Sequence, residues 1–249
     1  MRIDIFGIVL AACVASCLAK CQSKEGDIAE SYICEGINSL TELNTIPALA
    51  QKITILHSKI HLLPAGGFAR FAGSLHCLNI THSEVADIAG SAFAGLSQLY
   101  ELILDHNHIT VIKTDWIKDL GNLKILRVWH NHIKLIEPEV FAHLPNLELL
   151  DIAYNQIDQC IPPAHLEKLE NLEVLYVAGN PWPLRCRPPV AFHLEHHHVQ
   201  FINNWGNNHL LIEDCLAHEY GAQWDDQILA RCVANHLAKL SAPSIVPAH

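Results

Sequence analysis

Histidines recur at one fixed position in this chain. Eighteen of the 249 residues are histidine, and four of them stand 24 or 25 residues apart. If successive units stack as strands, these imidazoles lie about 5 Å apart, so one zinc ion could bridge two rings. The same column could sense pH, because neighbouring imidazoles repel once protonated. A purely structural use at a strand end is the alternative. The column consists of His57, His82, His106 and His130.

A second histidine cluster, HLEHHH, occupies residues 193–198. If this segment is helical, His193 and His197 share one face and could hold a metal ion. A solvated surface run is the alternative. Histidines also govern the formal charge, which runs from −10 with neutral imidazoles to +8 with all 18 protonated. Affinity for a charged partner could therefore invert between about pH 7 and 5.

The histidines of the column lie within a repeated sequence pattern, and the repeating units must position their side chains. Asn107, Asn131, Asn155 and Asn180 are 24, 24 and 25 residues apart, and each closes the frame Leu-x-x-Leu-x-Leu/Val/Ile-x-x-Asn. Serine holds the asparagine position in two earlier units. A period near 24 predicts stacked units, since no single unit can bury its apolar side alone. Each asparagine can bond backbone groups that would otherwise be buried and unpaired.

Each unit is expected to contain one short strand, whose alternate residues face opposite sides. In one such strand Leu102 and Leu104 point inward, while Glu101, Ile103 and Asp105 point outward. A second apolar column recurs in register further along each unit. We interpret it as core beneath the outer loops, formed by Phe68, Phe93, Ile117, Phe141 and Leu166.

This frame resembles the typical extracellular class of leucine-rich repeats over about residues 50–182, where roughly six units keep register. The resemblance implies an α/β solenoid with a parallel sheet on its concave face and a cap at each end. We expect caps over 20–49 and 183–240, a helix around Asp225–Leu240, and a disordered tail over 241–249. It also implies a surface for a partner and no catalytic apparatus.

The N-terminus predicts export. Residues 3–18 are apolar, follow Arg2 and lead into small residues, which is typical of a secretory signal peptide cleaved after Ala19. A bacterial lipoprotein cleavage box over 10–13 is the alternative. No later segment reaches 18 apolar residues, so no membrane span is expected. We therefore expect residues 1–19 to be a signal peptide and the protein to be secreted into an oxidising, extracellular space.

Export makes the cysteines candidates for disulfides. Seven of the nine remain after cleavage, and this odd number leaves at least one thiol free or bonded to another chain. Cys21 and Cys34 flank the start of the coil and could staple the N-terminal cap. Cys160 is expected to be a small core residue. Cys77 is expected on the concave face; if exposed it could link a dimer, and a half-buried inert thiol is the alternative.

The segment NPWPLRC at 180–186 resembles the opening of the cysteine-rich C-terminal cap of secreted leucine-rich-repeat proteins. Leu184 stands where that cap has its first cysteine. By the family's usual pairing, Cys186 would join Cys232 and leave Cys215 without a partner. Because of this departure, pairing of Cys215 with either of the other two remains open.

The concave face supplies the candidate binding site. Its N-terminal half is polar, whereas outward residues of its C-terminal half are apolar or aromatic, on strands about 4.8 Å apart. Such a patch usually meets a partner, and Trp, Tyr and Arg are frequent anchors. Coverage by the cap is the alternative. The candidate partner-binding residues are Ile103, Ile125, Arg127, Trp129, Leu149, Asp151, Tyr154 and Tyr176.

Asn79-Ile80-Thr81 is a glycosylation sequon on the same face. A glycan on Asn79 would shield the N-terminal half and leave the apolar half open.

Motifs for other functions are missing from the sequence. It has no zinc-protease, nucleophile-elbow, phosphate-loop or dinucleotide motif. We therefore expect that the protein is not an enzyme and binds no cofactor, except for zinc if the histidine column holds it. The acidic balance argues against binding of nucleic acid.

The sequence predicts an extracellular module that binds a protein ligand, with a disulfide-linked or non-covalent dimer as a further expectation. Similarity to the short leucine-rich immune proteins of mosquitoes implies innate immunity. The alternative is metal- or pH-responsive binding through the histidine column.

Overall fold

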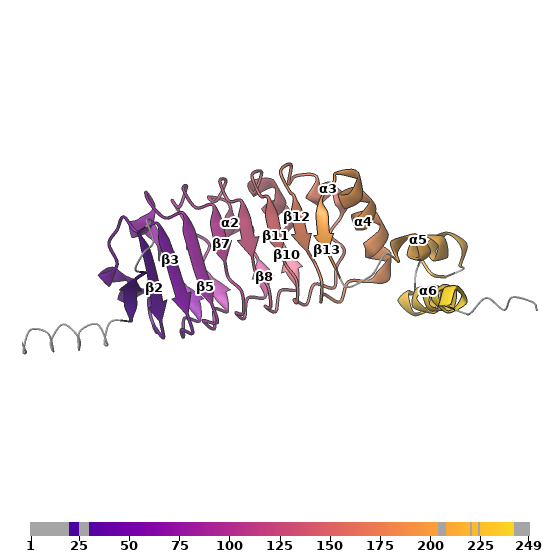
Figure 1. The fold of residues 1–249 in the computed structure, drawn as a ribbon, viewed down its shortest axis with the longest axis horizontal. Coiled ribbons are helices and arrows are strands. Elements are labelled where there is room, and N and C mark those ends of the chain that lie inside the picture. Colours follow the sequence, from indigo (N-terminus) through magenta and orange to yellow (C-terminus); the bar gives the residue numbers. More distant parts are fainter. Residues whose placement is uncertain (1–19, 25–29, 204–207, 220, 224, 242–249) are drawn as a thin grey trace, which may run out of the picture.

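The chain folds as a solenoid. A computed structural model describes residues 20–24, 30–203, 208–219, 221–223 and 225–241. The expected signal peptide, and the expected tail beyond Ser241, lie outside these residues. Figure 1 shows the units stacked in chain order along one axis, each contributing a strand to the same side.

One nine-stranded sheet, in the order β1-β2-β3-β5-β7-β9-β11-β12-β13, runs the length of the solenoid. β1 pairs antiparallel with β2, and every later neighbour pairs in parallel. Equivalent positions oppose one another, so Leu78, Leu102 and Leu126 stand in line. The six predicted repeats therefore align side by side. The strands are β1 (Cys21–Ser23), β2 (Ser31–Glu35), β3 (Lys52–Leu56), β5 (Cys77–Thr81), β7 (Glu101–Ile103), β9 (Ile125–Arg127), β11 (Leu149–Asp151), β12 (Val174–Tyr176) and β13 (Gln200–Ile202).

The interior follows the predicted alternation. Leu102 and Leu104 are fully buried, whereas Glu101 and Ile103 are only half-buried on the solvent side. The second apolar column, from Phe68 to Leu166, is buried as well, and its first two phenylalanine rings stack with centroids 5.8 Å apart. One continuous apolar core thus joins each unit to the next, and its removal from water stabilises the stack.

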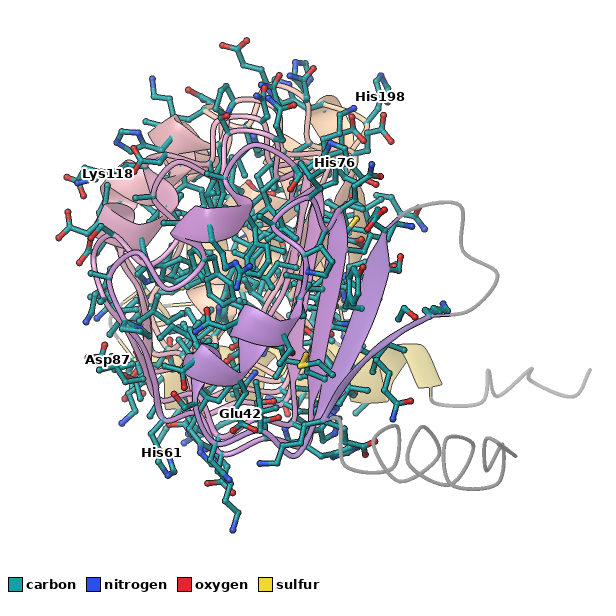
Figure 2. The ribbon with its side chains drawn as sticks, turned by 90° about the vertical axis from the view of Figure 1, so that its left-hand side faces the viewer. Glu42, His61, His76, Asp87, Lys118 and His198 are labelled. Atoms are coloured by element: carbon teal, nitrogen blue, oxygen red, sulfur yellow. A yellow bond between two sulfur atoms is a disulfide. The ribbon has the colours of Figure 1, made fainter. Side chains whose placement is uncertain are left out.

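Turns, short helices and two small parallel sheets form the side opposite the large sheet. Figure 2, viewed from the N-terminal end, shows Asp87 and Lys118 on this side, away from the strands. The elements are η1 (Leu40–Thr45), β4 (Leu62–Leu63), η2 (Ala69–Phe71), β6 (Asp87–Ile88), β8 (Val111–Ile112), α2 (Thr114–Ile117), β10 (Leu135–Ile136), η3 (Pro138–His143), α3 (Pro163–Leu166) and η4 (Leu184–Cys186).

The recurring asparagines form a hydrogen-bonded ladder, as their spacing predicts. Asn131 is buried, and its side-chain NH₂ donates to the carbonyls of Leu104 and Val128 at 2.9 and 3.1 Å. Its Oδ1 accepts from the Ile109 N–H of the preceding unit at 3.0 Å. Ser58 holds the equivalent position in an earlier unit. Its hydroxyl accepts a hydrogen bond from the Ile37 N–H at 3.1 Å and donates one to the carbonyl of Leu56. Each rung thus satisfies backbone groups of its own unit and of the one before.

The C-terminal segment extends the solenoid and then leaves it. Helix α4 (Arg187–His196) leads into β13, which adds a strand beyond the last predicted repeat. Helices α5 (His209–His218) and α6 (Asp226–Ser241) share a small core of their own, and α6 confirms the helix expected near residue 225. In Figure 1 both helices lie past the end of the sheet, so the described part of this segment leaves the face of the sheet open.

The disulfides correct two predictions. Cys21 pairs with Cys34, as expected, but Cys186 pairs with Cys160 rather than with Cys232. Cys232 pairs with Cys215, which is one of the two pairings the sequence leaves open. The reason is position: η4 lies against the turn that carries Cys160, with Cα atoms 5.1 Å apart, whereas α6 packs on α5. Cys160 is therefore an exposed, bridged residue and not a buried core thiol.

Candidate binding face

Strand register arranges the outward side chains of the C-terminal repeats in three rows. We call these rows, with the aromatic residue that follows them, the binding face. The first row is apolar, the middle row carries Arg127 and Asp151, and the third row, which begins where the strands end, carries Asp105. The rows contain Ile125, Leu149 and Val174; Ile103, Arg127, Asp151 and Tyr176; and Asp105, Trp129 and Ala153, followed by Tyr154.

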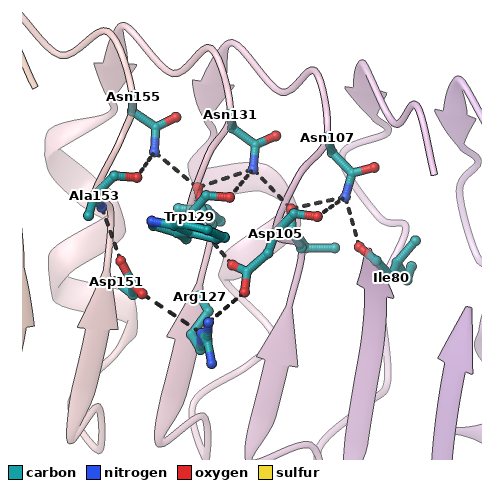
Figure 3. A network of polar contacts seen from close by, with 11 residues as sticks. Ile80, Asp105, Asn107, Arg127, Trp129, Asn131, Asp151, Ala153 and Asn155 are labelled. Carbon is teal, nitrogen blue, oxygen red and sulfur yellow. Dashed lines mark hydrogen bonds and ion pairs between the residues drawn. The ribbon is translucent and has the colours of Figure 1, made fainter. Parts of the chain in front are cut away.

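A guanidinium group between two carboxylates forms the centre of the binding face (Figure 3). Arg127 places an Nη atom 2.8 Å from Asp105 Oδ2 and its Nε 3.8 Å from Asp151 Oδ2. The other oxygen of each carboxylate is also engaged: Asp105 accepts from the Trp129 N–H at 2.8 Å, and Asp151 from the Ala153 N–H at 3.1 Å. Both aspartates are buried, whereas the arginine is partly open to solvent.

Burial sets the ionisation of this cluster. The pKa of Asp151 is raised to about 6, chiefly by loss of solvation and also by the charge of Asp105, while the bond from Ala153 and the charge of Arg127 oppose the shift. Burial also raises the pKa of Asp105, although Arg127 opposes the shift. One arginine between two carboxylates carries a net negative charge at neutral pH, and that charge falls when Asp151 takes up a proton.

Aromatic rings cover one side of the charge cluster. The Trp129 indole meets His106 edge-on with centroids 4.4 Å apart and meets Tyr154 at 5.9 Å. Tyr154 is 55% exposed, and Trp129 is half-buried. On the other side the first-row aliphatics, Ile125 and Leu149, are half-buried. An apolar partner surface could therefore contact both sides of the charged centre at once.

Backbone conformation explains why histidine recurs before each ladder residue. The position is left-handed in every unit, with φ of 46° at His57, 53° at His106 and 56° at His130. Tyr154 and Gly179 hold the same position later, with φ of 53° and 72°. Histidine tolerates this region several times better than most residues with a side chain. The structure therefore gives the column a conformational role that the spacing alone does not reveal.

The column also stacks. His82 and His106 have ring centroids 4.1 Å apart, and His106 and His130 have centroids 4.6 Å apart; the His57 ring lies 5.2 Å from that of His82. Burial lowers the pKa of His106, and the charges of its two neighbours lower it further. Protonation along the column is thus mutually unfavourable, as expected for stacked imidazoles.

A metal role for this column remains a prediction. Among the described residues, the group of three potential ligands whose atoms lie within 4.8 Å of one another is Cys215, Cys232 and His236. Its two sulfurs are joined in a disulfide, so they supply no thiolate, the form in which cysteine binds metal.

Two further predicted sites lie on the N-terminal half of the sheet. Among the described residues Cys77 is the free cysteine, but it is buried, and burial raises the pKa of its thiol. The predicted disulfide-linked dimer requires an exposed Cys77 thiol, and this thiol is buried. Asn79 is half-buried in the middle of β5, opposite Thr54 and Ile103. Glycosylation of Asn79 stays a prediction.

The fold thus brings the eight predicted partner-binding residues onto one continuous face. Sequence reasoning missed Asp105 as a member of it, although this residue completes the charge cluster. The sequence did contain a signal for this cluster. Asp105 and Asp151 are acidic residues at outward positions in the units on either side of the unit that carries Arg127.

Comparison with known proteins agrees with this architecture. A family model described as leucine rich repeat matches residues 73–126 and 121–181. The crystal structure of a TLR13–ssRNA13 complex is similar with a TM-score of 0.57 and 27% identity, covering 65% of this chain and 23% of that one. The fold is that of a leucine-rich-repeat solenoid. A leucine-rich-repeat protein of Leptospira interrogans shares this fold, with a TM-score of 0.53 and 22% identity over 68% of this chain and 40% of that one.

A curated relative of this leucine-rich-repeat solenoid is the trophoblast glycoprotein of Macaca fascicularis. It is 32% identical over 100 residues, which are 39% of this chain and 23% of that protein. The chain thus spans about a quarter of the length of the curated relative it matches. Leucine-rich-repeat solenoids generally serve as protein-binding modules without enzymatic activity or cofactor. None of the helices in the described ranges is both long and apolar enough to cross a membrane.

Proposed function

We propose that this solenoid is an extracellular recognition module that holds a protein ligand on its binding face. The observation that carries the proposal is the arrangement around Arg127: a desolvated charge cluster flanked by an open apolar row and an open aromatic group. Central, well-packed aromatic and arginine side chains dominate the energetics of protein interfaces. The described part of the C-terminal segment lies past the sheet and leaves this surface accessible.

An extracellular setting is part of the same proposal. Three disulfides fit an oxidising compartment, and the relative named above is a glycoprotein. A glycan on Asn79 would cover the polar end of the sheet and direct a partner towards the other end. The resemblance to short leucine-rich immune proteins favours a ligand of the innate immune system.

A protein ligand is favoured over a nucleic acid by the charge of the face. The guanidinium of Arg127 is already matched by two carboxylates, so the face lacks the basic stripe that phosphate backbones require. The similar TLR13 structure is a complex with single-stranded RNA, and the test below therefore also examines crosslinking to RNA.

The test uses a photo-reactive amino acid placed at Leu149 or, as a matched control, at Thr54. Both positions are half-buried and outward on the same sheet. We expect a discrete crosslinked protein from the native fluid only at Leu149, and Leu149→Glu should abolish its binding while the circular dichroism stays unchanged. Equal crosslinking at both positions, or crosslinking to RNA alone, would refute the proposal. Sedimentation of the purified chain tests whether a second copy occupies the face.

A pH-responsive binder is the second candidate. The charge of His82, a member of the stacked column, acts on Asp105, and burial raises the pKa of Asp151 to about 6. The face therefore becomes more positive as pH falls from about 7 to 5. Repeating the capture at pH 7.4 and 5.5 distinguishes the candidates, because a basic ligand would dissociate at the lower pH and an acidic one would bind more tightly.

A further inference from the structure

A cavity away from the binding face collects histidines and glutamates. It has a volume of about 260 Å³ and lies between α4 and the segment that follows α3. The two elements lie side by side in Figure 1. Buried leucines form its floor. Its polar lining consists of Glu167, Glu170, His193 and His197.

His193 lies in the last turn of α4, and His197 caps the C-terminal end of that helix one turn later. Their ring centroids are 4.4 Å apart and the rings are tilted by 41°, so both imidazoles occupy the same side of the helix. Neutral imidazole nitrogen is a preferred ligand of zinc and of similar transition-metal cations. This pair therefore supplies two of the three protein ligands that an open zinc site uses.

The glutamates face this pair from the repeat side. Glu167 is close enough for its charge to act on His193. Burial lowers the pKa of His193, and the neighbouring His197 and His196 lower it further, which outweighs the effect of Glu167.

We propose that His193 and His197, completed by the carboxylate of Glu167, form a binding site for a divalent transition-metal cation such as Zn²⁺. The ligating atoms of these three described side chains are not all within 4.8 Å of one another. Glu167 and His197 are exposed, so both side chains have room to turn toward an ion held by His193. Glu170 lines the same cavity and can accept a hydrogen bond from a metal-bound water.

Metal at this site would join α4 to the last repeats. His193 and His197 belong to the C-terminal segment, and Glu167 belongs to the repeat that precedes β12. A ligand that binds only the folded chain stabilises it by mass action. Zinc is therefore expected to raise the unfolding temperature as well as to bind.

The test is calorimetric titration of the whole chain with ZnCl₂ at pH 7.4. We expect saturable binding of one ion, weakened at least about tenfold by His193→Ala and by His197→Ala. Glu167→Gln should weaken it to a smaller extent. The matched control is His198→Asn, because asparagine tolerates the left-handed backbone of His198, which has a φ of 58°. His198 belongs to the same sequence cluster but is exposed (Figure 2) and does not line the cavity.

Three outcomes would overturn the site: no saturable binding in the micromolar range, equal loss in the His198 control, or loss on replacing His106 and His130 of the column. Since His197 is exposed, its variant should fold even if the His193 variant does not. Acidification to pH 5.5 should also weaken binding, because protons compete with metal ions for imidazole nitrogen. None of these readouts depends on the protein ligand of the binding face.

Discussion

Single residues decide whether the backbone of this solenoid is satisfied. The ladder asparagines bond to carbonyl and N–H groups of two successive units, and all of them are buried. No apolar side chain can replace these bonds. A buried polar group left without a partner costs more than a typical hydrogen bond contributes.

Asn131→Ala tests this point. The substitution leaves the Ile109 N–H without its acceptor and removes one of the two amide donors of the Leu104 carbonyl, the other being Asn107. We expect a loss of about 2–3 kcal/mol in the free energy of unfolding. Asn122→Ala is the control, since Asn122 is exposed and bonds only the Ser97 carbonyl. That change should cost less than about 1 kcal/mol. Urea denaturation measures both, and similar losses would contradict the ladder argument.

Asp151 gives the binding face a titratable group. Burial raises its pKa to about 6 from an ordinary value of 3.8, so the unfolded chain ionises this carboxyl at lower pH than the folded chain does. Its contribution to stability is therefore fully present below the unfolded pKa and is lost as pH rises through about 6.

Asp151→Asn removes this dependence. We expect the variant to be more stable than the parent by about 1 kcal/mol above pH 6.5, with the difference vanishing by about pH 4. Denaturation midpoints between pH 4 and 8 measure it, and the histidines contribute equally to both proteins. A difference that stays constant with pH would show that Asp151 does not titrate in this range.

At the scale of the repeat, one left-handed position controls each turn. Gly179 holds it in the last unit, with φ of 72°, and the Tyr154 ring lies against it. An added Cβ would meet the Cδ1 atom of that ring at 2.7 Å. The absence of a side chain at Gly179 thus lets Tyr154 lie along the sheet at the edge of the binding face.

Gly179→Ala should therefore affect both stability and the face. We expect a loss of about 1–3 kcal/mol from the left-handed backbone and the displaced ring, together with weaker ligand binding. Gly121→Ala is the matched control, because an added Cβ there meets nothing within 4 Å. Its effect should be within about 0.5 kcal/mol. Thermal unfolding and ligand capture measure the pair, and equal effects would refute this explanation.

At the scale of the whole molecule, the residues that the structure describes form two apolar cores of different size. The larger runs through the repeats into α4, and the smaller lies between α5 and α6, closed by the disulfide between Cys215 and Cys232. The bond between Cys160 and Cys186 belongs to the larger core and ties the last repeats to the start of the C-terminal segment.

Removing the two bonds should have different consequences. Without the bond between Cys215 and Cys232, limited proteolysis should cut within 208–241 while the repeats remain intact. Without the bond between Cys160 and Cys186, we expect a loss of about 2–4 kcal/mol that includes the repeats. Mass spectrometry of the fragments from the two double Cys→Ser variants measures this. Equal loss of protection across the chain in both would show that the cores are not independent.

Much of this architecture could be predicted from the chain alone. The period near 24 predicts the stacked strands, and the alternation of Leu102, Ile103 and Leu104 predicts which side chains are buried. These signals are local, because every unit repeats the same requirement for an apolar interior and a bonded turn. Asn107 and its equivalents therefore predicted the ladder, and Trp129 was already a candidate for the binding face.

Contacts between distant units required the tertiary structure. The sequence predicted the wrong partner for Cys186, because disulfide pairing depends on how close the Cα atoms come and not on order along the chain. It missed Asp105, because the pairing of that carboxylate with Arg127 follows from strand register. The sequence also suggested metal binding for the histidine column. It could not show the left-handed backbone conformation that gives histidine a structural role at this position. The chain by itself determined the coil and its buried side; the packing of one turn on the next decided which charges, rings and sulfurs meet.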